Sequence, residues 1–266
     1  MKDPYYFDDC QVLRNKLNIK DAAALEQAES NITAVRAATV DIATKSIPFS
    51  FKRLKAIHKH LFEPVYNWAG QPRLINIEKP EKVLAGMSVD YGDYHSLEKM
   101  AEQAISAMNK INWKELKMDE RAEKFSKSIA AIWKTHAFRE GNTRTVMTFA
   151  KQFGDAHGFL IDGSLFQKHA AFTRNALVMA SIGEYSEYQH LTNIMRDAME
   201  SGQKNLQKAV QSRSLETPNP IQEYCQDVYG HPGNQYIVEQ EINDLKRLYQ
   251  STAKQPYDLE SPSMDR

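Results

Sequence analysis

The chain has 266 residues, and its 34 basic and 34 acidic side chains cancel to a net charge of +0. A chain of this length can bury a core for one large domain, or for one domain with an appendage. The balanced charge argues against nucleic acid as a partner, and no apolar run is long enough for a transmembrane segment. Cys10 and Cys225 lie far apart in the sequence. They form no disulfide framework, which fits a reduced compartment.

The first sixty residues predict an irregular arm followed by two helices. Residues 1–20 are rich in tyrosine, and Tyr5, Tyr6 and Phe7 are expected to pin this arm onto the domain. Apolar residues then recur at three- and four-residue steps after Asp21, and again after Ser50, each of which is expected to cap a helix. The basic residues and histidines of the second helix predict a solvated face, with a target-docking role as the alternative. These residues are Lys52, Arg53, Lys55, His58, Lys59 and His60.

Residues 71–90 contain the one stretch that predicts β-structure, a hairpin flap. Residues 73–77 alternate in the two-residue period of an extended edge, and Pro80 then breaks the pattern. An open edge strand can pair with a partner through main-chain hydrogen bonds, so the flap predicts a docking site for a target protein. An ordinary surface hairpin is the alternative. The expected docking residues are Ile75, Asn76, Ile77, Lys79 and Leu84.

The rest of the domain, to about residue 202, predicts helices that surround a short loop. One helix is expected from Ser96 and another from Asp119, each with a periodic apolar face. A third apolar face begins at Val146, and two further helices are expected before residue 202. The loop between the second and third of these helices, residues 136–144, has the sequence HAFREGNTR.

The loop combines residue types that suit phosphoryl or nucleotidyl transfer. Gly141 and Asn142 allow a tight turn, so the free N–H groups of the following helix can face an anion. Arg144 adds a planar fork suited to phosphate oxygens, and Glu140 is a hard ligand for Mg²⁺. His136 can accept a proton from an attacking hydroxyl. A satisfied histidine beside a solvated Arg–Glu pair is the alternative.

This loop closely resembles the signature of Fic-domain proteins, which reads His-x-Phe-x-(Asp/Glu)-Gly-Asn-Gly-Arg-x-x-Arg. Residues 66–77, YNWAGQPRLINI, resemble the segment that leads into the Fic flap. The resemblance implies an all-α core with a small β-hairpin flap, covering roughly residues 20–200. It also implies transfer of AMP from ATP to a Ser, Thr or Tyr hydroxyl of a target protein. His136 would then be the general base and Glu140 the Mg²⁺ ligand, with the nucleotide held by Arg139, Gly141, Asn142, Thr143 and Arg144.

Two positions depart from the Fic signature. Thr143 replaces the second Gly, and its β-branched side chain resists positive φ but can cap the following helix. Met147 replaces the final Arg, and a thioether cannot pair with a phosphate, so ATP binding is expected to suffer. Two alternatives to adenylylation therefore remain. One is transfer from another phosphate-containing donor, and the other is a recruitment module with altered or lost activity.

The chain beyond residue 202 predicts a C-terminal appendage, residues 203–266, that serves as a connector or begins a further domain. Many Fic proteins carry an inhibitory motif, Ser/Thr-x-x-x-Glu-Gly/Asn, and here only the run ending at Glu216 fits its first part. A separate antitoxin chain is the alternative regulator. Because no N-terminal signal peptide is evident, the expected location is the cytoplasm, or a host cell reached by export without signal cleavage.

Overall fold

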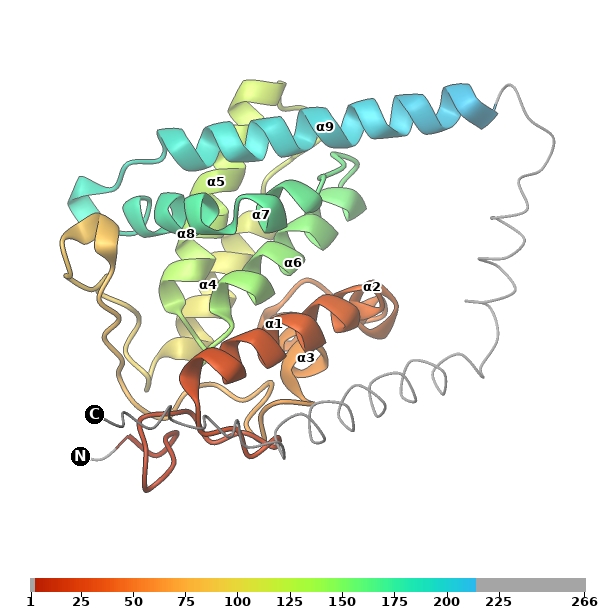
Figure 1. The fold of residues 1–266 in the computed structure, drawn as a ribbon. Helices are drawn as coiled ribbons and strands as arrows, with labels where there is room; N and C mark the ends of the chain where they lie inside the picture. The colour runs from red at the N-terminus through yellow and green to blue at the C-terminus, as the bar shows by residue number, and fades with distance from the viewer. Residues whose placement is uncertain (1–2, 214–266) are drawn as a thin grey trace, which may run out of the picture.

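The computed structural model describes residues 3–213, with side chains to residue 208, and these residues form a helical bundle (Figure 1). Most of the expected appendage, residues 203–266, therefore lies outside the described residues, and Glu216 lies wholly outside them. The α-helices are α1 (Ala22–Ala37), α2 (Val40–Thr44), α3 (Phe51–Phe62), α4 (Leu97–Asn109), α5 (Met118–Thr135), α6 (Asn142–Ala156), α7 (Ser164–Lys168), α8 (Ala170–Met179) and α9 (Gln189–Arg213). Two short 3-10 helices are η1 (Lys82–Leu84) and η2 (Gly183–Tyr185).

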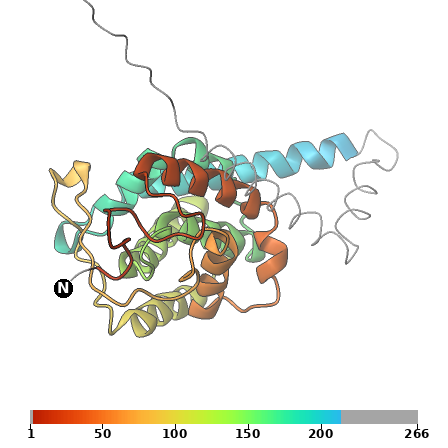
Figure 2. The same ribbon diagram turned by 60° about the horizontal axis from the view of Figure 1, so that its bottom comes forward.

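Helices α5 and α6 lie at the centre of the bundle and are joined by the loop at residues 136–141. Helix α5 packs against α4, α6 and α9, while α6 packs against α3, which is in turn covered by α1 and α2 (Figures 1 and 2). The apolar residues that the sequence places at helical spacing are buried, among them Phe125, Trp133, Phe149 and Phe153. The prediction of an all-α core is confirmed, and its packing fixes both ends of the loop.

The prediction of a β-hairpin flap is wrong, because no strand is present in residues 3–213. The N–H of Lys79 donates to Ser88 Oγ at 3.0 Å, and Pro80 has no N–H to offer a ladder. The N–H groups of Glu81 and Gly86 instead close a tight turn around η1. The segment is therefore a loop with two extended limbs, which we call the flap loop (residues 71–93).

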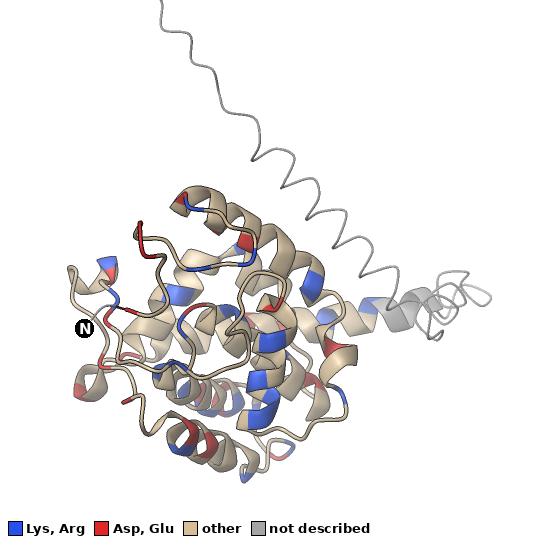
Figure 3. Cartoon of the chain, turned by 90° about the horizontal axis from the view of Figure 1, so that it is seen from below, with Lys and Arg blue, Asp and Glu red and all other residues tan. Residues whose placement is uncertain are grey.

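Charge is distributed without a dominant sign over the described bundle. Basic and acidic residues are interspersed among the elements when the molecule is seen from below (Figure 3). Within residues 3–213 no helix combines the length and apolar character that a membrane crossing needs.

Candidate active site

His136 ends α5 in a left-handed conformation, with φ of 45°. Only 1% of the residue is exposed, and its ring lies against Tyr91, with 4.0 Å between the ring centroids, and against Trp133. Both ring nitrogens are buried without a hydrogen-bond partner among the described residues. Burial, together with the charges of Lys79, Arg174 and Arg73, holds the pKa of His136 well below its usual value. The imidazole is therefore neutral and has a free lone pair, as a general base requires.

The first turn of α6 follows directly and is the candidate anion site, which we call the cradle. Gly141 precedes the helix with φ of 76°, and a Cβ atom at this position would lie 2.3 Å from the ring of Phe62. Only glycine fits here, both in backbone conformation and in space. Asn142 uses its side chain to brace the loop, since its Oδ1 accepts from Phe138 N–H at 2.9 Å and its Nδ2 donates to Phe138 O at 2.7 Å. The N–H groups that begin α6 are thus held in place for a phosphate.

Glu140 presents its carboxylate beside this cradle, and its side chain is 33% exposed. Its Oε1 accepts from Gly141 N–H at 3.0 Å, and its Oε2 pairs with Lys79 Nζ at 2.8 Å. Burial alone would raise the pKa of Glu140, but Lys79, Gly141 N–H and Arg144 outweigh burial and lower that pKa to about 2. Glu140 is therefore ionised, and the ammonium of a flap residue sits where a cation bound to Oε2 would sit.

Replacing Lys79 with Met should raise the affinity of the protein for Mn²⁺, a spectroscopic substitute for Mg²⁺. A hydrogen bond to a charged group contributes about 1.5–3 kcal/mol, so releasing Oε2 should strengthen cation binding by about tenfold. Titration followed by electron paramagnetic resonance measures the change, with Lys82→Met on exposed η1 as the control. Equal affinities for the wild type and Lys79→Met would show that Lys79 does not compete for this carboxylate.

Arg144, in the first turn of α6, points its guanidinium toward α1. Its Nη1 donates to Thr33 Oγ1 at 2.9 Å, and its Nη2 forms an ion pair with Glu29 Oε1. The side chain of Glu29 is only 6% exposed, and its other oxygen accepts from the hydroxyl of Tyr66. Burial raises the pKa of Glu29, while Arg144 and Tyr66 act in the opposite direction. In this conformation the cation expected to bind phosphate is held by a buried carboxylate.

The loop fits a magnesium-bound nucleotide by the chemistry of its donors. Glu140 is an ionised hard ligand, and the start of α6 offers N–H groups to phosphate oxygens. Among the described residues there is no cluster of three or more His, Cys, Asp or Glu side chains that would enclose a metal. This arrangement suits Mg²⁺, which is commonly bound through one or two carboxylates together with substrate phosphates and water.

Comparison with known proteins identifies the family. A model of the Fic/DOC family matches residues 48–154. The "Probable protein adenylyltransferase y4lH" of Sinorhizobium fredii is 31% identical over 171 residues, a match that covers 62% of this chain and 81% of that protein. The chain belongs to the Fic/DOC family. The "Protein adenylyltransferase VbhT" of Bartonella schoenbuchensis is also 31% identical, over 69% of this chain, but this chain spans only 36% of the length of VbhT.

Solved Fic structures share the fold. The crystal structure of the BepC protein of Bartonella tribocorum, a VirB-translocated effector with bound AMPPNP, superposes with a TM-score of 0.62 at 22% identity. That match covers 73% of this chain and 95% of the BepC chain. The N-terminal Fic domain of a VirB-translocated Bep effector from Bartonella quintana, with bound ADP, gives a TM-score of 0.57 at 24% identity. The bundle described above is therefore the Fic fold.

At three positions of the Fic motif the side chain contacts other parts of the protein. Arg139 pairs with Asp3, with 2.8 Å between Nη2 and Oδ2, and thereby fixes the N-terminal arm. Thr143 lies within α6, where no positive φ is needed, and its hydroxyl accepts from Trp133 Nε1 at 3.0 Å instead of capping the helix. Met147 is 6% exposed and belongs to the hydrophobic core. The structure therefore brings His136, Glu140 and the N-terminal turn of α6 together without these three side chains.

Met147→Arg should destabilise the protein without strengthening nucleotide binding. An arginine at position 147 would place its charge in the hydrophobic core. A buried charge without a partner destabilises the folded protein by about 3–5 kcal/mol. A melting curve and a calorimetric ATP titration measure the two effects, with Met147→Leu as the volume-matched control. A gain in ATP affinity with an unchanged melting temperature would instead show that position 147 reaches the phosphates.

The predicted docking residues lie on the flap loop beside His136. Asn76 and Ile77 line a hollow of about 920 Å³ that also includes Tyr91, whose ring lies against the His136 ring. Ile75 is half-buried, Leu84 packs partly against the core, and Lys79 turns inward to Glu140. Sequence reasoning missed Arg73, which is 1% exposed and donates from Nε to His136 O at 2.9 Å. Arg73 ties the start of the flap loop to the expected base.

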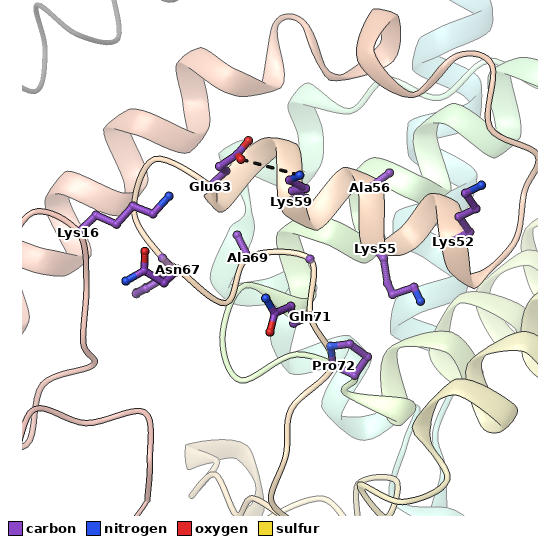
Figure 4. Close-up of a pocket in the computed structure, with 12 residues that line it drawn as sticks. Lys16, Lys52, Lys55, Ala56, Lys59, Glu63, Asn67, Ala69, Gln71 and Pro72 are labelled. Carbon is purple, nitrogen blue, oxygen red and sulfur yellow. Dashed lines mark ion pairs between the residues drawn. The ribbon is translucent and has the colours of Figure 1, made fainter.

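The basic face of α3 is partly as predicted. Lys52, Lys55 and Lys59, with Lys16, line an open groove of about 570 Å³ (Figure 4). Lys55 lies 3.8 Å from Glu98 and Lys59 lies 3.9 Å from Glu63, so carboxylates accompany these cations. This is the expected solvated face. The prediction was wrong for Arg53 and His58, which are 8% and 0% exposed and point into the protein.

Proposed function

We propose that this chain transfers AMP from ATP to a Ser, Thr or Tyr hydroxyl of a target protein. The proposal rests mainly on one observation. A single loop brings together a neutral, buried His136, an ionised Glu140 and the N-terminal turn of α6. The relatives named protein adenylyltransferase, of which y4lH is matched over most of its length, support the same activity.

In the proposed reaction the target hydroxyl attacks the α-phosphorus of ATP in line with the leaving pyrophosphate. One O–P bond forms to the target oxygen, and the bond between the α-phosphorus and the bridging oxygen breaks. His136 takes the hydroxyl proton on a ring nitrogen, which has no other partner among the described residues. The N–H groups of α6 hold phosphate oxygens, so the loop contributes positioning and charge stabilisation.

Glu140 is the residue that would hold Mg²⁺, which when bound would neutralise phosphate charge in the transition state. Two ion pairs described above must open before the loop can be loaded. Lys79 has to leave Glu140 for the cation to bind, and Arg144 has to leave Glu29 to reach phosphate oxygens. We infer that the conformation described here is a closed form of the site.

The deciding experiment is calorimetric titration with ATP and Mg²⁺, alongside a panel of other nucleotides, followed by labelling of lysate proteins. Protein labelled from α-³²P-ATP but not from γ-³²P-ATP is the result expected for adenylylation. Label from the γ-position would reveal phosphate transfer and overturn the proposal. Absence of nucleotide binding at millimolar concentration would instead favour the recruitment module.

A second donor is the alternative that a specific observation favours. Met147 lies in the core where the Fic signature has its final Arg, so this position offers no charge to the distal phosphates. A donor with fewer or differently placed phosphates would not need a cation at position 147 in order to bind. The nucleotide panel tests this alternative directly, since such a donor should then bind more tightly than ATP.

A further inference from the structure

His58 is a buried histidine on α3 that links two parts of the site. It is 0% exposed, and its ring is stacked between Phe62 and Phe138, with 4.7 Å and 3.9 Å between the ring centroids. Its Nε2 lies 3.0 Å from Glu140 O, and its Nδ1 lies 2.8 Å from the N–H of Gly70. One edge of the ring therefore holds the motif loop, and the other holds the turn that leads into the flap loop.

The two partners fix a single form of the ring. The carbonyl of Glu140 can only accept, so Nε2 must carry the proton, and the N–H of Gly70 can only donate, so Nδ1 must be bare. Burial keeps this neutral tautomer, lowering the pKa of His58 to about 3, and the Glu140 carbonyl opposes that shift only in part. If the two ring nitrogens of His58 exchanged their donor and acceptor roles, a hydrogen bond would be lost in a place that water does not reach.

The bond to Glu140 lies at a point where backbone orientation determines chemistry. Glu140 is followed by Gly141 in the left-handed region, pressed against the ring of Phe62, so the peptide between them has little freedom. The direction of the Glu140 carbonyl sets the direction of the adjoining carboxylate and of the Gly141 N–H that it accepts. A group that fixes this carbonyl thereby fixes the cation ligand.

The bond to Gly70 sets the opposite wall. Gly70 has φ of 79°, and a Cβ atom there would lie 2.7 Å from Lys59 Cβ, so the turn lies tight against α3. Three residues later, Arg73 donates from Nε to the carbonyl of His136. The His58 ring thus connects α3 both to the turn that leads into the flap loop and to the loop at residues 136–141.

We propose that His58 is a positioning residue that orients Glu140 for the divalent cation, and does so through its Nε2–H bond to the Glu140 carbonyl. The metal-binding part of this inference rests on the proposed function. The positioning part does not, because it concerns the hydrogen bonds and mobility of the loop itself.

Three variants separate the two bonds. His58→Phe keeps the stacked ring and removes both hydrogen bonds. His58→Gln places a donor near the Nε2 position and can restore the bond to Glu140. His58→Asn places an acceptor near the Nδ1 position and can restore only the bond to Gly70. Melting curves identify any variant that does not fold.

The first measurement is Mn²⁺ affinity in the presence of ATP, by electron paramagnetic resonance. His58→Phe and His58→Asn should bind Mn²⁺ at least about tenfold more weakly than the wild type, the loss expected for one well-oriented hydrogen bond to the loop. His58→Gln should recover most of that loss. The proposal would be overturned if His58→Phe bound Mn²⁺ as tightly as the wild type does. It would also be overturned if His58→Asn recovered the affinity and His58→Gln did not.

A second measurement keeps the inference testable if the wild type binds no Mn²⁺ with ATP, a result that would count against the proposed function. Nitrogen chemical shifts of the His58 ring should show the Nε2–H tautomer at neutral pH, because the Glu140 carbonyl and the Gly70 N–H fix that form. Amide hydrogen exchange at Gly141 should speed up in His58→Phe and return toward wild type in His58→Gln. The other tautomer, or unchanged exchange in His58→Phe, would show that His58 only fills space.

Discussion

Substituting His136 with Asn should abolish transfer and leave the fold intact. General-base catalysis typically contributes about 10²–10⁴-fold, so the labelling rate should fall by at least this factor. Asn is preferred to Ala because His136 has φ of 45°, and Asn tolerates the left-handed region better than Ala. Circular dichroism and the melting curve should match the wild type, and the exposed His95→Ala serves as the control for histidine removal.

The pH dependence of the same reaction tests the environment of His136. Its pKa is held well below the usual value, so the neutral base form persists as the pH falls. The labelling rate should therefore stay level between about pH 8 and pH 6, whereas an unperturbed histidine would lose half its base form near pH 6.5. A half-maximal rate near pH 6.5 would mean that the working imidazole is solvated. Loss of folding in His136→Asn would instead assign His136 a structural role.

The helices and the motif loop could be predicted from the sequence because they depend on local patterns. Apolar spacing placed Phe125, Trp133, Phe149 and Phe153 in the core, where the structure buries them. The left-handed turn at Gly141 also follows from local chemistry, since glycine adopts positive φ without steric cost. The flap loop did not follow its local pattern, because its backbone groups bond to Ser88 Oγ and to each other across a turn.

Two of the residues that sequence reasoning missed, besides Arg73, are polar side chains on apolar helix faces. His58 lies four residues after Leu54 and three before Leu61, which places it on the buried face of α3. Glu29 has the same relation to Leu25 and Ile32 on α1. A polar residue at such a position is buried and must have a partner, but the partner's identity depends on tertiary contacts between distant segments. The spacing could have flagged both residues, while their bonds to the loop could not be predicted.

The carboxylate that pairs with Arg144 illustrates this limit. A search for the inhibitory Fic motif leads to Glu216, which lies outside the described residues. In the structure Glu29 pairs with Arg144, although Leu25 stands where the motif has Ser or Thr and Ser30 where it has Gly or Asn. The pairing therefore depends on the packing of α1 over α3 and α6, and a short sequence pattern does not describe it.

Glu29→Gln should strengthen binding of ATP by about tenfold or more, the order expected when a charge-assisted contact is released for a new partner. Gln keeps the size of the side chain and can still accept from Tyr66, while the charge that holds Arg144 is removed. Because the side chain of Arg144 is 41% exposed, water can solvate it once the charge of Glu29 is removed, and the melting temperature should change little. Calorimetry with ATP and Mg²⁺ measures the gain.

The control for this prediction is Glu26→Gln, which removes a carboxylate from the exposed face of the same helix. If Glu29→Gln and Glu26→Gln raise the affinity equally, long-range charge explains the effect and the ion pair does not. If Glu29→Gln binds ATP as the wild type does, Arg144 does not need to leave α1. A selective gain in Glu29→Gln that disappears in the double variant Glu29→Gln with Arg144→Met would show that the buried carboxylate withholds Arg144 from the phosphates, and that α1 is the element that keeps the site closed.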